Sequence, residues 1–342
     1  MRNYYVISLL FCLIILSSCK EEHEPDANQP INNQTLNVYV AGVELNQNTN
    51  KDVAKYWKNG NAVILSNSTT GADATSIVVS GSDVNVAGSE WNGTANVALY
   101  WKNGYPITLS DNTMDAHATS IVVVGNDVYV AGYITLGNQA SQNVALYWKN
   151  GKAIILSDST MNAHANSIAL SSTDVYVAGD AHAVATYWKN GNAVILSSGS
   201  MGSYATSIAV LGNNVYVAGN KILGSHVIAN YWKNGNSVDL TGGPYSSASS
   251  IVISDTDVYV AGNQFGSPSF LAKYWKNGQA VSLTDGSNYG YAYSIALSDT
   301  DVYVAGYESN GSYDVAKYWK NGNAITLGTN NSRAKSLFLS KE

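Results

Sequence analysis

The pentapeptide Tyr-Trp-Lys-Asn-Gly occurs seven times and constrains the fold more than any other feature of this chain. The copies begin 40 to 47 residues apart, at Tyr56, Tyr100, Tyr147, Tyr187, Tyr231, Tyr274 and Tyr318. Two further motifs occur seven times each, Val-Tyr-Val-Ala-Gly (with Asn85 replacing the Tyr once) and Ser-Ile or Ser-Leu. A period of this size indicates an array in which each copy is one supersecondary unit.

Each repeat predicts four short β-strands, because its apolar runs are rich in Val, Ile, Tyr and Ala and have strand length. In the second repeat these runs are residues 76–79, 84–87, 97–101 and 107–109. Asn-Gly separates the third run from the fourth, and both residues tolerate the positive φ of a type I′ hairpin turn. Consecutive strands are therefore expected to be antiparallel.

Four antiparallel strands in each of seven repeats predict an all-β, seven-bladed β-propeller over residues 35–342. A parallel β-solenoid would not need the Asn-Gly hairpins. The first copy enters at its second strand, at Val38, whereas the last copy leaves a single first strand at 336–339. We expect these fragments to form one blade, so that the C-terminal strand pairs with the N-terminal blade and closes the ring.

The order of strands in the repeat resembles the kelch repeat, in which a Val-Tyr-Val strand ending in Gly precedes a strand carrying Tyr. The repeat departs from kelch in having Ala-Gly in place of a Gly pair and Trp beside Tyr, and it lacks the Trp-Asp dipeptide of WD40 repeats. The repeat unit thus resembles kelch-like β-propeller repeats. This resemblance assigns no functional residues.

The N-terminus is typical of an exported, lipid-anchored protein. Arg2 precedes an apolar run at 6–16, which is too short to span a bilayer and is typical of a secretory signal. Leu16-Ser17-Ser18-Cys19 resembles the lipobox of bacterial lipoproteins, which implies lipidation of Cys19; an ordinary signal peptide with a chance cysteine is the alternative. These signals predict a signal peptide at 1–18, a flexible tether at 19–34 and the propeller at 35–342.

The tether begins with a basic residue followed by acidic ones, Lys20-Glu21-Glu22, and so resembles the export signal of surface-displayed lipoproteins in some Gram-negative bacteria. The sequence therefore predicts an outer-membrane lipoprotein at the cell surface, with the membrane as a partner through its lipid anchor. Only 12% of residues are charged and the net charge is −6, which argues against a nucleic-acid partner. The cysteines are Cys12 and Cys19, which leaves the propeller without a disulfide.

Variation among the repeats is confined to one face. The distance from the motif Trp to the next Leu is eight positions in all seven copies, whereas the distance from the Gly of the second strand to the Ala of the third is 12, 10, 13, 6, 10, 10 and 10 positions. In a four-stranded meander, the second-to-third connection lies at the same end as the connection between blades. A constant scaffold with variable loops at one end is typical of a binding surface.

Seven unlike side chains precede the Ser of the first strands by three positions, where we expect the mouth of the central channel. These candidate ligand-binding residues are Asp73, His117, His164, Tyr204, Ser247, Tyr291 and Arg333. Together they suit a small-ligand site. The two histidines could bind a divalent metal with Asp73 or Asp115, but they lie in similar repeats, so common ancestry explains both, and we predict no metal and no cofactor.

Trp91 is the only tryptophan outside the repeated motif and lies in a polar loop, either as a loop anchor or as a stacking platform. The seven motif tryptophans are expected to pack between blades, and the lysines that follow them to be solvated. No nucleophile elbow, Walker loop or zinc signature occurs, and no catalytic residue is assigned. We therefore expect a non-catalytic binding or adhesion module for a glycan or protein. The alternative is a polysaccharide-cleaving enzyme with rim carboxylates, drawn from Asp73, Glu90, Asp115, Asp180 and Glu308.

Overall fold

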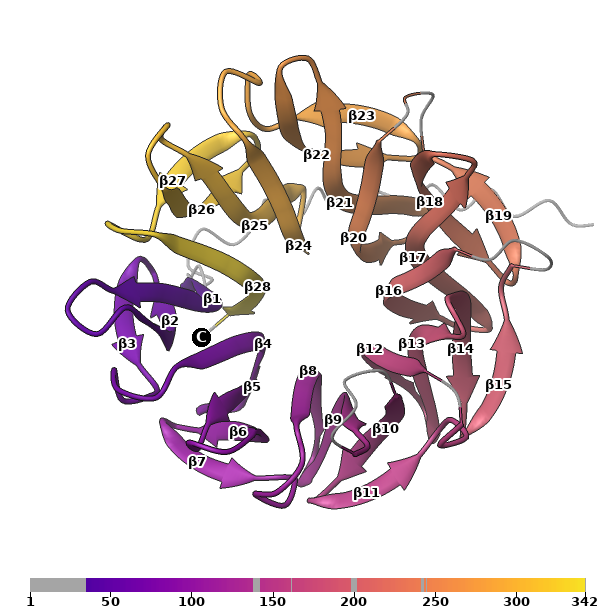
Figure 1. Cartoon of the computed structure of the whole chain (residues 1–342). Coiled ribbons are helices and arrows are strands. Elements are labelled where there is room, and N and C mark those ends of the chain that lie inside the picture. The colour runs from indigo at the N-terminus through magenta and orange to yellow at the C-terminus, as the bar shows by residue number, and fades with distance from the viewer. Residues whose placement is uncertain are drawn as a thin grey trace, which may run out of the picture. The chain divides into compact units, whose positions relative to one another are not determined.

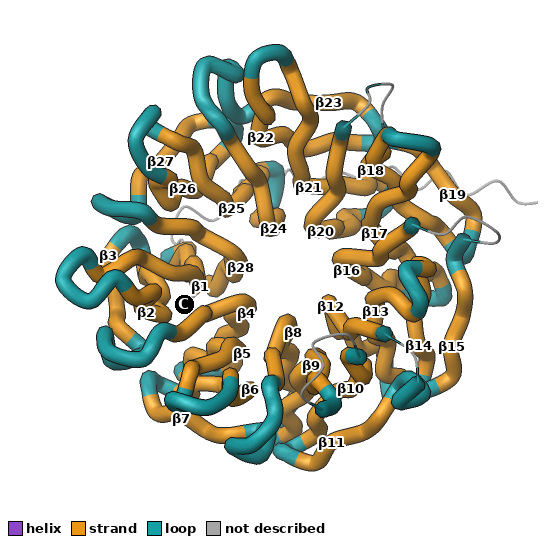
Figure 2. The backbone as a smooth tube through the Cα atoms, viewed as in Figure 1, coloured by secondary structure: helices purple, strands orange, loops and turns teal. Residues whose placement is uncertain are grey.

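The computed structural model describes residues 35–137, 142–160, 162–197, 202–240, 243 and 245–341. Every regular element in these ranges is a β-strand, as Figure 2 shows for the whole ring. Among these residues, no helix is long and apolar enough to cross a membrane. Cys19, the signal peptide and the tether lie outside the described residues.

The strands form seven separate four-stranded antiparallel sheets, which are arranged as blades around a central opening (Figure 1). The first blade contains β28 (Ser332–Lys341), β1 (Leu36–Asn46), β2 (Lys51–Lys58) and β3 (Asn61–Ile64). The next three contain β4 (Ala72–Ser80), β5 (Asp83–Trp91), β6 (Asn96–Lys102) and β7 (Tyr105–Thr108); β8 (Ala116–Val124), β9 (Asp127–Thr135), β10 (Asn143–Lys149) and β11 (Lys152–Ile155); and β12 (Ala163–Ser171), β13 (Asp174–Ala181), β14 (Val184–Lys189) and β15 (Asn192–Ile195). The last three contain β16 (Ser203–Leu211), β17 (Asn214–Leu223), β18 (His226–Lys233) and β19 (Asn236–Asp239); β20 (Ser246–Ser254), β21 (Asp257–Gly266), β22 (Ser269–Lys276) and β23 (Gln279–Ser282); and β24 (Gly290–Ser298), β25 (Asp301–Ser309), β26 (Asp314–Lys320) and β27 (Asn323–Thr326).

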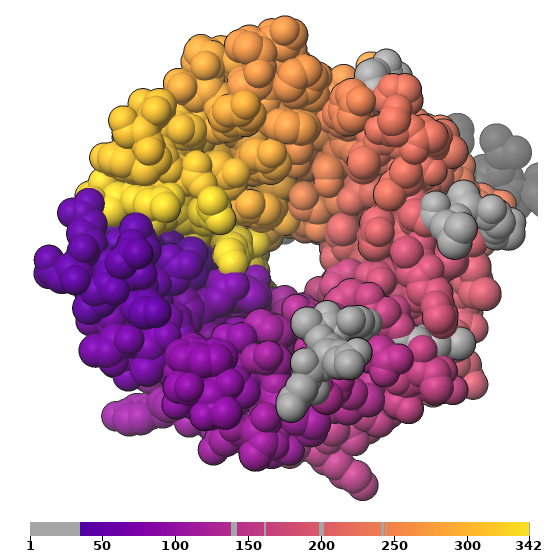
Figure 3. Space-filling view, viewed as in Figure 1, coloured from indigo at the N-terminus to yellow at the C-terminus, as the bar shows by residue number. Residues whose placement is uncertain are grey.

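The ring closes through the first blade, in which β28 from the end of the chain pairs antiparallel with β1 from the beginning, from Leu36↔Lys341 to Glu44↔Ser332. This confirms the predicted seven-bladed propeller and its closure. The innermost strand of each blade borders the central opening, which the space-filling view shows to be open (Figure 3). Those strands are β28, β4, β8, β12, β16, β20 and β24.

The Asn-Gly hairpins form as predicted. The seven motif asparagines have φ values of 49° to 52° and the seven glycines have 80° to 85°, so both turn residues are left-handed, as a type I′ turn requires. In the first blade, Lys58 pairs directly with Asn61 across the two-residue turn. The Asn59 carboxamide oxygen also accepts a hydrogen bond from the Val38 N–H at 2.8 Å, which ties the hairpin to the second strand.

The recurrent Ser-Ile motif joins each blade to the next. In every blade the Ser hydroxyl accepts a hydrogen bond from the N–H of the following Ile or Leu position in the neighbouring blade, at 3.1 to 3.4 Å. The last of these bonds runs from Leu337 to Ser294 and the first from Ile77 to Ser336, so the ring of hydrogen bonds is closed. The hydroxyl satisfies a backbone donor of the innermost strand that its own sheet leaves unpaired.

The seven motif tryptophans form the core between blades, since each is no more than 2% exposed. In the second blade, for example, Trp101 packs with Ala54 and Tyr39 of the first. The tryptophans are therefore not an aromatic ligand box. The lysines that follow them are partly exposed but not free in solvent: Lys149 lies 3.1 Å from Asp127 and 5.0 Å from the ring centre of Tyr129, and equivalent contacts recur in other blades.

A hydroxyl group satisfies the backbone N–H of the alanine at the centre of each third strand, but two sequence positions share this task. A Ser or Thr after the fourth strand serves Ala54, Ala98, Ala145 and Ala272, through Ser66, Ser110, Ser157 and Thr284. The first residue of the following innermost strand serves Ala185, Ala229 and Ala316, through Ser203, Ser246 and Ser332. In the blades where the residue after the fourth strand supplies the hydroxyl, the following innermost strand begins with Ala or Gly.

Because either of two positions can supply the hydroxyl group, we predict one substitution that lowers stability and a second that partly restores it. Ser332→Ala should cost about 1–3 kcal/mol of the free energy of unfolding, because the Ala316 N–H, in a residue with no exposed surface, loses its acceptor. Adding Gly328→Ser should recover part of that loss by restoring the arrangement of Ser110 and Ala116; the loop must shift, because a β-carbon at position 328 would lie 2.6 Å from that of residue 332. Urea unfolding of the parent and both variants measures the effect, and equal stability of Ser332→Ala and the parent would contradict it.

Candidate functional site

The variable connections lie together at one end of the blades, which we call the variable face. The loop between blades and the loop between second and third strands are joined by backbone hydrogen bonds, such as Trp91 N–H to the Gly71 carbonyl at 2.9 Å and Thr135 N–H to the Asp115 carbonyl at 2.8 Å. Similar bonds recur in other blades, for example from His182 to Asn162. The Lys-Asn-Gly hairpins lie at the opposite end of the blades.

A pocket of about 480 Å³ opens on the variable face and contains four of the eight candidate ligand-binding residues. We call it the rim pocket. Those four are Asp73, Trp91, His117 and Arg333; the lining also includes Lys51, Asp52, Ser89, Asn96 and Lys335. Its volume falls within the range of about 300–1,000 Å³ typical of small-molecule sites. Three blades contribute side chains, so the pocket exists only in the closed ring.

Two cations that line the rim pocket, Lys335 and Arg333, are each paired with a carboxylate. The Lys335 ammonium is 2.6 Å from Asp73 Oδ2, and both side chains are about one-third exposed. The other carboxylate oxygen, Asp73 Oδ1, is buried and has no hydrogen-bond partner among the described residues. Arg333 donates through Nε and Nη2 to Asp314 Oδ2, both at 2.7 Å, which fixes its guanidinium plane.

Trp91 is the last residue of β5 and is 38% exposed. Its backbone is held by the bond to Gly71, while the indole ring lines the rim pocket. This placement favours the stacking platform over the loop anchor, because an anchor would bury the ring.

The two candidate histidines flank Tyr133. His117 stacks on Tyr133 with ring centres 5.0 Å apart, and His164 meets the same ring edge-on at 4.8 Å. Burial lowers the pKa of His117, so the imidazole is neutral at pH 7 and can donate and accept hydrogen bonds. His164 lies within hydrogen-bond distance of Asp180 Oδ2 (3.2 Å) and Asn143 Nδ2 (2.7 Å). No group of three or more His, Cys, Asp or Glu that could hold a metal occurs in the described ranges.

The other candidates do not join the rim pocket. Tyr204 is 37% exposed on the fifth blade, Ser247 is half-buried on the sixth, and Tyr291 of the seventh packs among aromatic rings of the sixth and seventh. The positions are equivalent in all blades, but neighbouring side chains around the channel mouth form separate clusters. The sequence predicted seven side chains around one ligand. The structure instead places three of these seven in the rim pocket and the other four on neighbouring surfaces.

Each carboxylate of the polysaccharide-cleaving alternative has a structural partner. Asp73 pairs with Lys335, Glu308 with Lys317 at 2.6 Å, and Asp180, 4% exposed, faces His164. Glu90 accepts from the Thr70 hydroxyl at 2.9 Å, and Asp115 accepts from the Asn96 N–H at 2.7 Å. Each of the five therefore takes part in a contact within the propeller.

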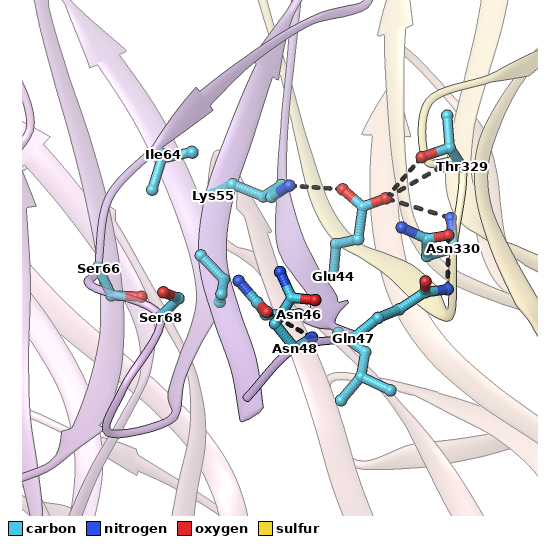
Figure 4. Close-up of a pocket in the computed structure, with 12 residues that line it drawn as sticks. Glu44, Asn46, Gln47, Asn48, Lys55, Ile64, Ser66, Ser68, Thr329 and Asn330 are labelled. Carbon is cyan, nitrogen blue, oxygen red and sulfur yellow. Dashed lines mark hydrogen bonds and ion pairs between the residues drawn. The ribbon is translucent and has the colours of Figure 1, made fainter. Parts of the chain in front are cut away.

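A second pocket, also of about 480 Å³, lies where the chain ends meet on the variable face (Figure 4). Its central group is the carboxylate of Glu44 on β1. One oxygen accepts from Lys55 Nζ at 2.5 Å, and the other accepts from the N–H and hydroxyl of Thr329 and from the N–H of Asn330, at 3.1 to 3.2 Å. Glu44 therefore holds the loop before β28 against β1.

Glu44→Gln should destabilise the protein at neutral pH and remove part of its acid sensitivity. Burial by itself would raise the pKa of Glu44, but the hydrogen bonds from Lys55, Thr329 and Asn330 outweigh it and hold the pKa below its ordinary value of 4.5. Since the folded state binds this proton less readily than the unfolded state, the stabilisation is complete above pH 4.5 and is lost as the pH falls through the lowered pKa.

We expect Glu44→Gln to cost about 1–3 kcal/mol at pH 7 and progressively less below pH 4.5, as measured by chemical unfolding between pH 3 and 7. Glu308→Gln is the matched control, since Glu308 pairs with Lys317 at similar exposure but, among the described residues, has no hydrogen bond to a neighbouring loop. Equal effects of the two substitutions at every pH would contradict the role of Glu44 in holding the seam.

Sequence reasoning missed Lys335 and the pairing of Arg333. Lys335 occupies a position that is Thr75, Thr119, Asn166, Thr206, Ser249 or Tyr293 in the other repeats. In four blades the side chain at this position donates to the carbonyl of an alanine in the next blade. The sequence could have identified Lys335 as a candidate, because it is the one charged residue at a position that is uncharged in the other repeats. No signal indicated the partner of Arg333, because Asp314 lies 19 residues away, at the start of β26.

Comparisons with known proteins show a similarity in fold alone. No protein-family model matches the sequence, and no curated protein matches it. Among solved structures, the chain is similar to an acylaminoacyl peptidase from Pyrococcus horikoshii, with a TM-score of 0.54 and 12% sequence identity; the alignment covers 86% of this chain and 51% of that one. This chain thus spans about half the length of the peptidase. At this identity the likeness shows the propeller fold alone.

Proposed function

We propose that this protein is a non-catalytic binding module that recognises a glycan through the rim pocket. The observation that carries the proposal is the meeting, in one concave site, of the exposed Trp91 ring with Asp73, His117 and Arg333. These four side chains come from positions that the repeated scaffold does not dictate. Their combination supports a ligand that has an apolar face and many hydroxyl groups.

A sugar ring fits this chemistry. Its C–H face packs on an indole ring, and its hydroxyls both donate and accept hydrogen bonds. The pocket offers acceptors on Asp73, donors on Arg333, and a neutral imidazole on His117. A protein partner would instead need a broad surface of about 800 Å² on each side. The concave shape and the volume of about 480 Å³ therefore favour a small glycan unit.

Trp91→Ala tests the proposal. A glycan array followed by calorimetry on the 35–342 propeller should identify an oligosaccharide that binds the parent and raises its melting temperature. Trp91→Ala should weaken that binding about tenfold or more. The control is Tyr105→Ala in the same blade, because Tyr105 is 77% exposed but follows a Lys-Asn-Gly hairpin at the opposite end. Absence of sugar binding, or equal loss in both variants, would overturn the proposal.

We further propose that the mature chain is a lipoprotein, anchored at Cys19 in the outer membrane and displayed on the cell surface. The supporting features are the apolar run at 6–16, the lipobox-like residues before Cys19 and the basic-acidic start of the tether. Several acyl chains would make the attachment effectively permanent. Cys19→Ala should move the protein from the membrane to the soluble fraction, and protease added to intact cells should remove the parent's propeller; membrane retention of Cys19→Ala would contradict the anchor.

A further inference from the structure

A continuous row of aromatic side chains crosses three blades of the variable face. Consecutive ring centres are 5.1 to 6.4 Å apart, and each ring contacts the next. We call this set the aromatic row; in order its members are His226, Tyr245, Phe265, Phe270, Tyr291 and Tyr307. The repeat scaffold does not require these rings, since most equivalent positions of the other blades carry other residues, although some of the rings recur once, for example Tyr291, Tyr307 and His226 as Tyr204, Tyr133 and His182.

One end of the aromatic row, Tyr307, lies next to the rim pocket. Arg333 lines that pocket, and its guanidinium carbon lies 5.3 Å from the ring centre of Tyr307. Arg333 is the only arginine in the sequence besides Arg2, and its two hydrogen bonds to Asp314 fix its plane. The pocket and the row are therefore parts of one surface that extends from the third blade, through the second, first, seventh and sixth, to the fifth.

The far end of the row is exposed. Tyr245 and Phe265 are 43% and 42% exposed, whereas the blade cores bury their tryptophans almost completely. Tyr245 also has a φ of 65°, a left-handed conformation that bulky residues rarely adopt and that costs of order 1–3 kcal/mol. An exposed ring on a strained backbone contributes little to stability. It suits a role in which the ring contacts a ligand.

We propose that the aromatic row is an extended subsite for a linear, uncharged polysaccharide whose end or internal unit occupies the rim pocket. This inference rests on the proposed glycan-binding function and deepens it. The exposed rings of Tyr245 and Phe265, whose centres lie 6.4 Å apart, offer stacking contacts to a chain of sugar residues. Tyr307 is 7% exposed and stacks on Tyr291, so it supports the row rather than contacting the sugar chain. Arg333, which links the row to the pocket, is neutralised by Asp314, which favours a neutral chain over an acidic one.

A series of neutral oligosaccharides of increasing length, drawn from the family found to bind, tests the inference by calorimetry. The parent should bind long chains at least tenfold more tightly than short ones. Phe265→Ala and Tyr245→Asn should each reduce the affinity for long chains about five- to tenfold and leave the affinity for the shortest chain unchanged. Trp91→Ala should weaken the binding of short and long chains alike.

Melting temperatures separate a ligand contact from a structural role. Asn tolerates a positive φ better than Tyr does, so Tyr245→Asn should melt no lower than the parent while it loses affinity for long chains. Equal affinity of the parent for short and long chains would overturn the subsite and leave the pocket intact. Preference for an acidic polymer of the same length would also overturn it. Failure of every sugar to bind would overturn the proposed function and this inference together.

Discussion

Gly132→Ala is expected to destabilise the propeller by at least about 3 kcal/mol, a large loss for the addition of one methyl group. A β-carbon at Gly132 would lie far inside van der Waals contact of the His117 backbone carbonyl and 2.7 Å from Cζ3 of Trp148. The carbonyl cannot move aside, because a β-bulge in β8 between Ala118 and Ser120 places it over the glycine. Urea unfolding of the parent and the variant measures the loss.

Gly125→Asp is the control in the same blade. Gly125 has a φ of 59° and open space around its α-carbon, and Asp255 and Asp299 hold φ values of 52° at the equivalent turns. We therefore expect Gly125→Asp to change the stability by less than about 1 kcal/mol. If the two substitutions cost the same, the requirement for glycine in Val-Tyr-Val-Ala-Gly would not come from the bulge and the tryptophan.

Removal of β28 is expected to abolish cooperative unfolding of the propeller. A chain that ends at Asn331 lacks the innermost strand of the first blade, so β1 loses the pairing that extends from Leu36 to Glu44. The truncation also removes Ser332, Arg333, Ser336 and Leu337 from the seam, the inter-blade hydrogen-bond ring and the core. The exposed edge of β1 should then pair with other chains and cause aggregation.

A peptide of residues 332–341, added to the truncated chain, should restore a monomeric, cooperatively unfolding protein. Analytical ultracentrifugation and calorimetry of the truncated chain, alone and with the peptide, provide the measurement. A truncated chain that stays monomeric and melts at the temperature of the parent would contradict the account of ring closure.

The repeats allowed the scaffold to be predicted almost completely from sequence. Asn-Gly hairpins, strand-length apolar runs and the incomplete first and last repeats were sufficient for seven blades and for their closure. The role of Ser in the Ser-Ile motif could not be predicted, because its hydrogen bond joins residues about 44 positions apart whose alignment depends on how adjacent blades stack. Likewise, the need for Gly in the second strand depends on a bulge that no local signal marks.

The candidate site was predictable in position but not in composition. Comparison of the repeats located Asp73, His117 and Arg333 at equivalent places near the channel mouth. It could not show that Lys335 reaches Asp73, or that Arg333 turns to Asp314 and Tyr307, because these contacts depend on side-chain direction between blades. Of the aromatic row, the comparison of the repeats singled out Tyr291, because the other rings lie in loops and strand ends that no repeated motif marks.

The residues that are identical in every repeat and the residues that differ between repeats have different structural roles. The identical parts of each repeat, namely the tryptophan core, the serine ring and the Asn-Gly hairpins, hold the blades together. The unlike parts meet on the variable face. Substitutions on that face should therefore change ligand binding with little effect on stability, except at Glu44 and at residues that satisfy buried backbone groups.

The crystal structure of residues 35–342 with the tightest-binding oligosaccharide tests the central claim most directly. We predict a sugar residue stacked on Trp91 and hydrogen-bonded to Asp73 or His117, with the chain continuing past Arg333 toward Tyr291. A sugar bound instead at the end that carries the Lys-Asn-Gly hairpins would contradict the assignment of the variable face as the binding surface.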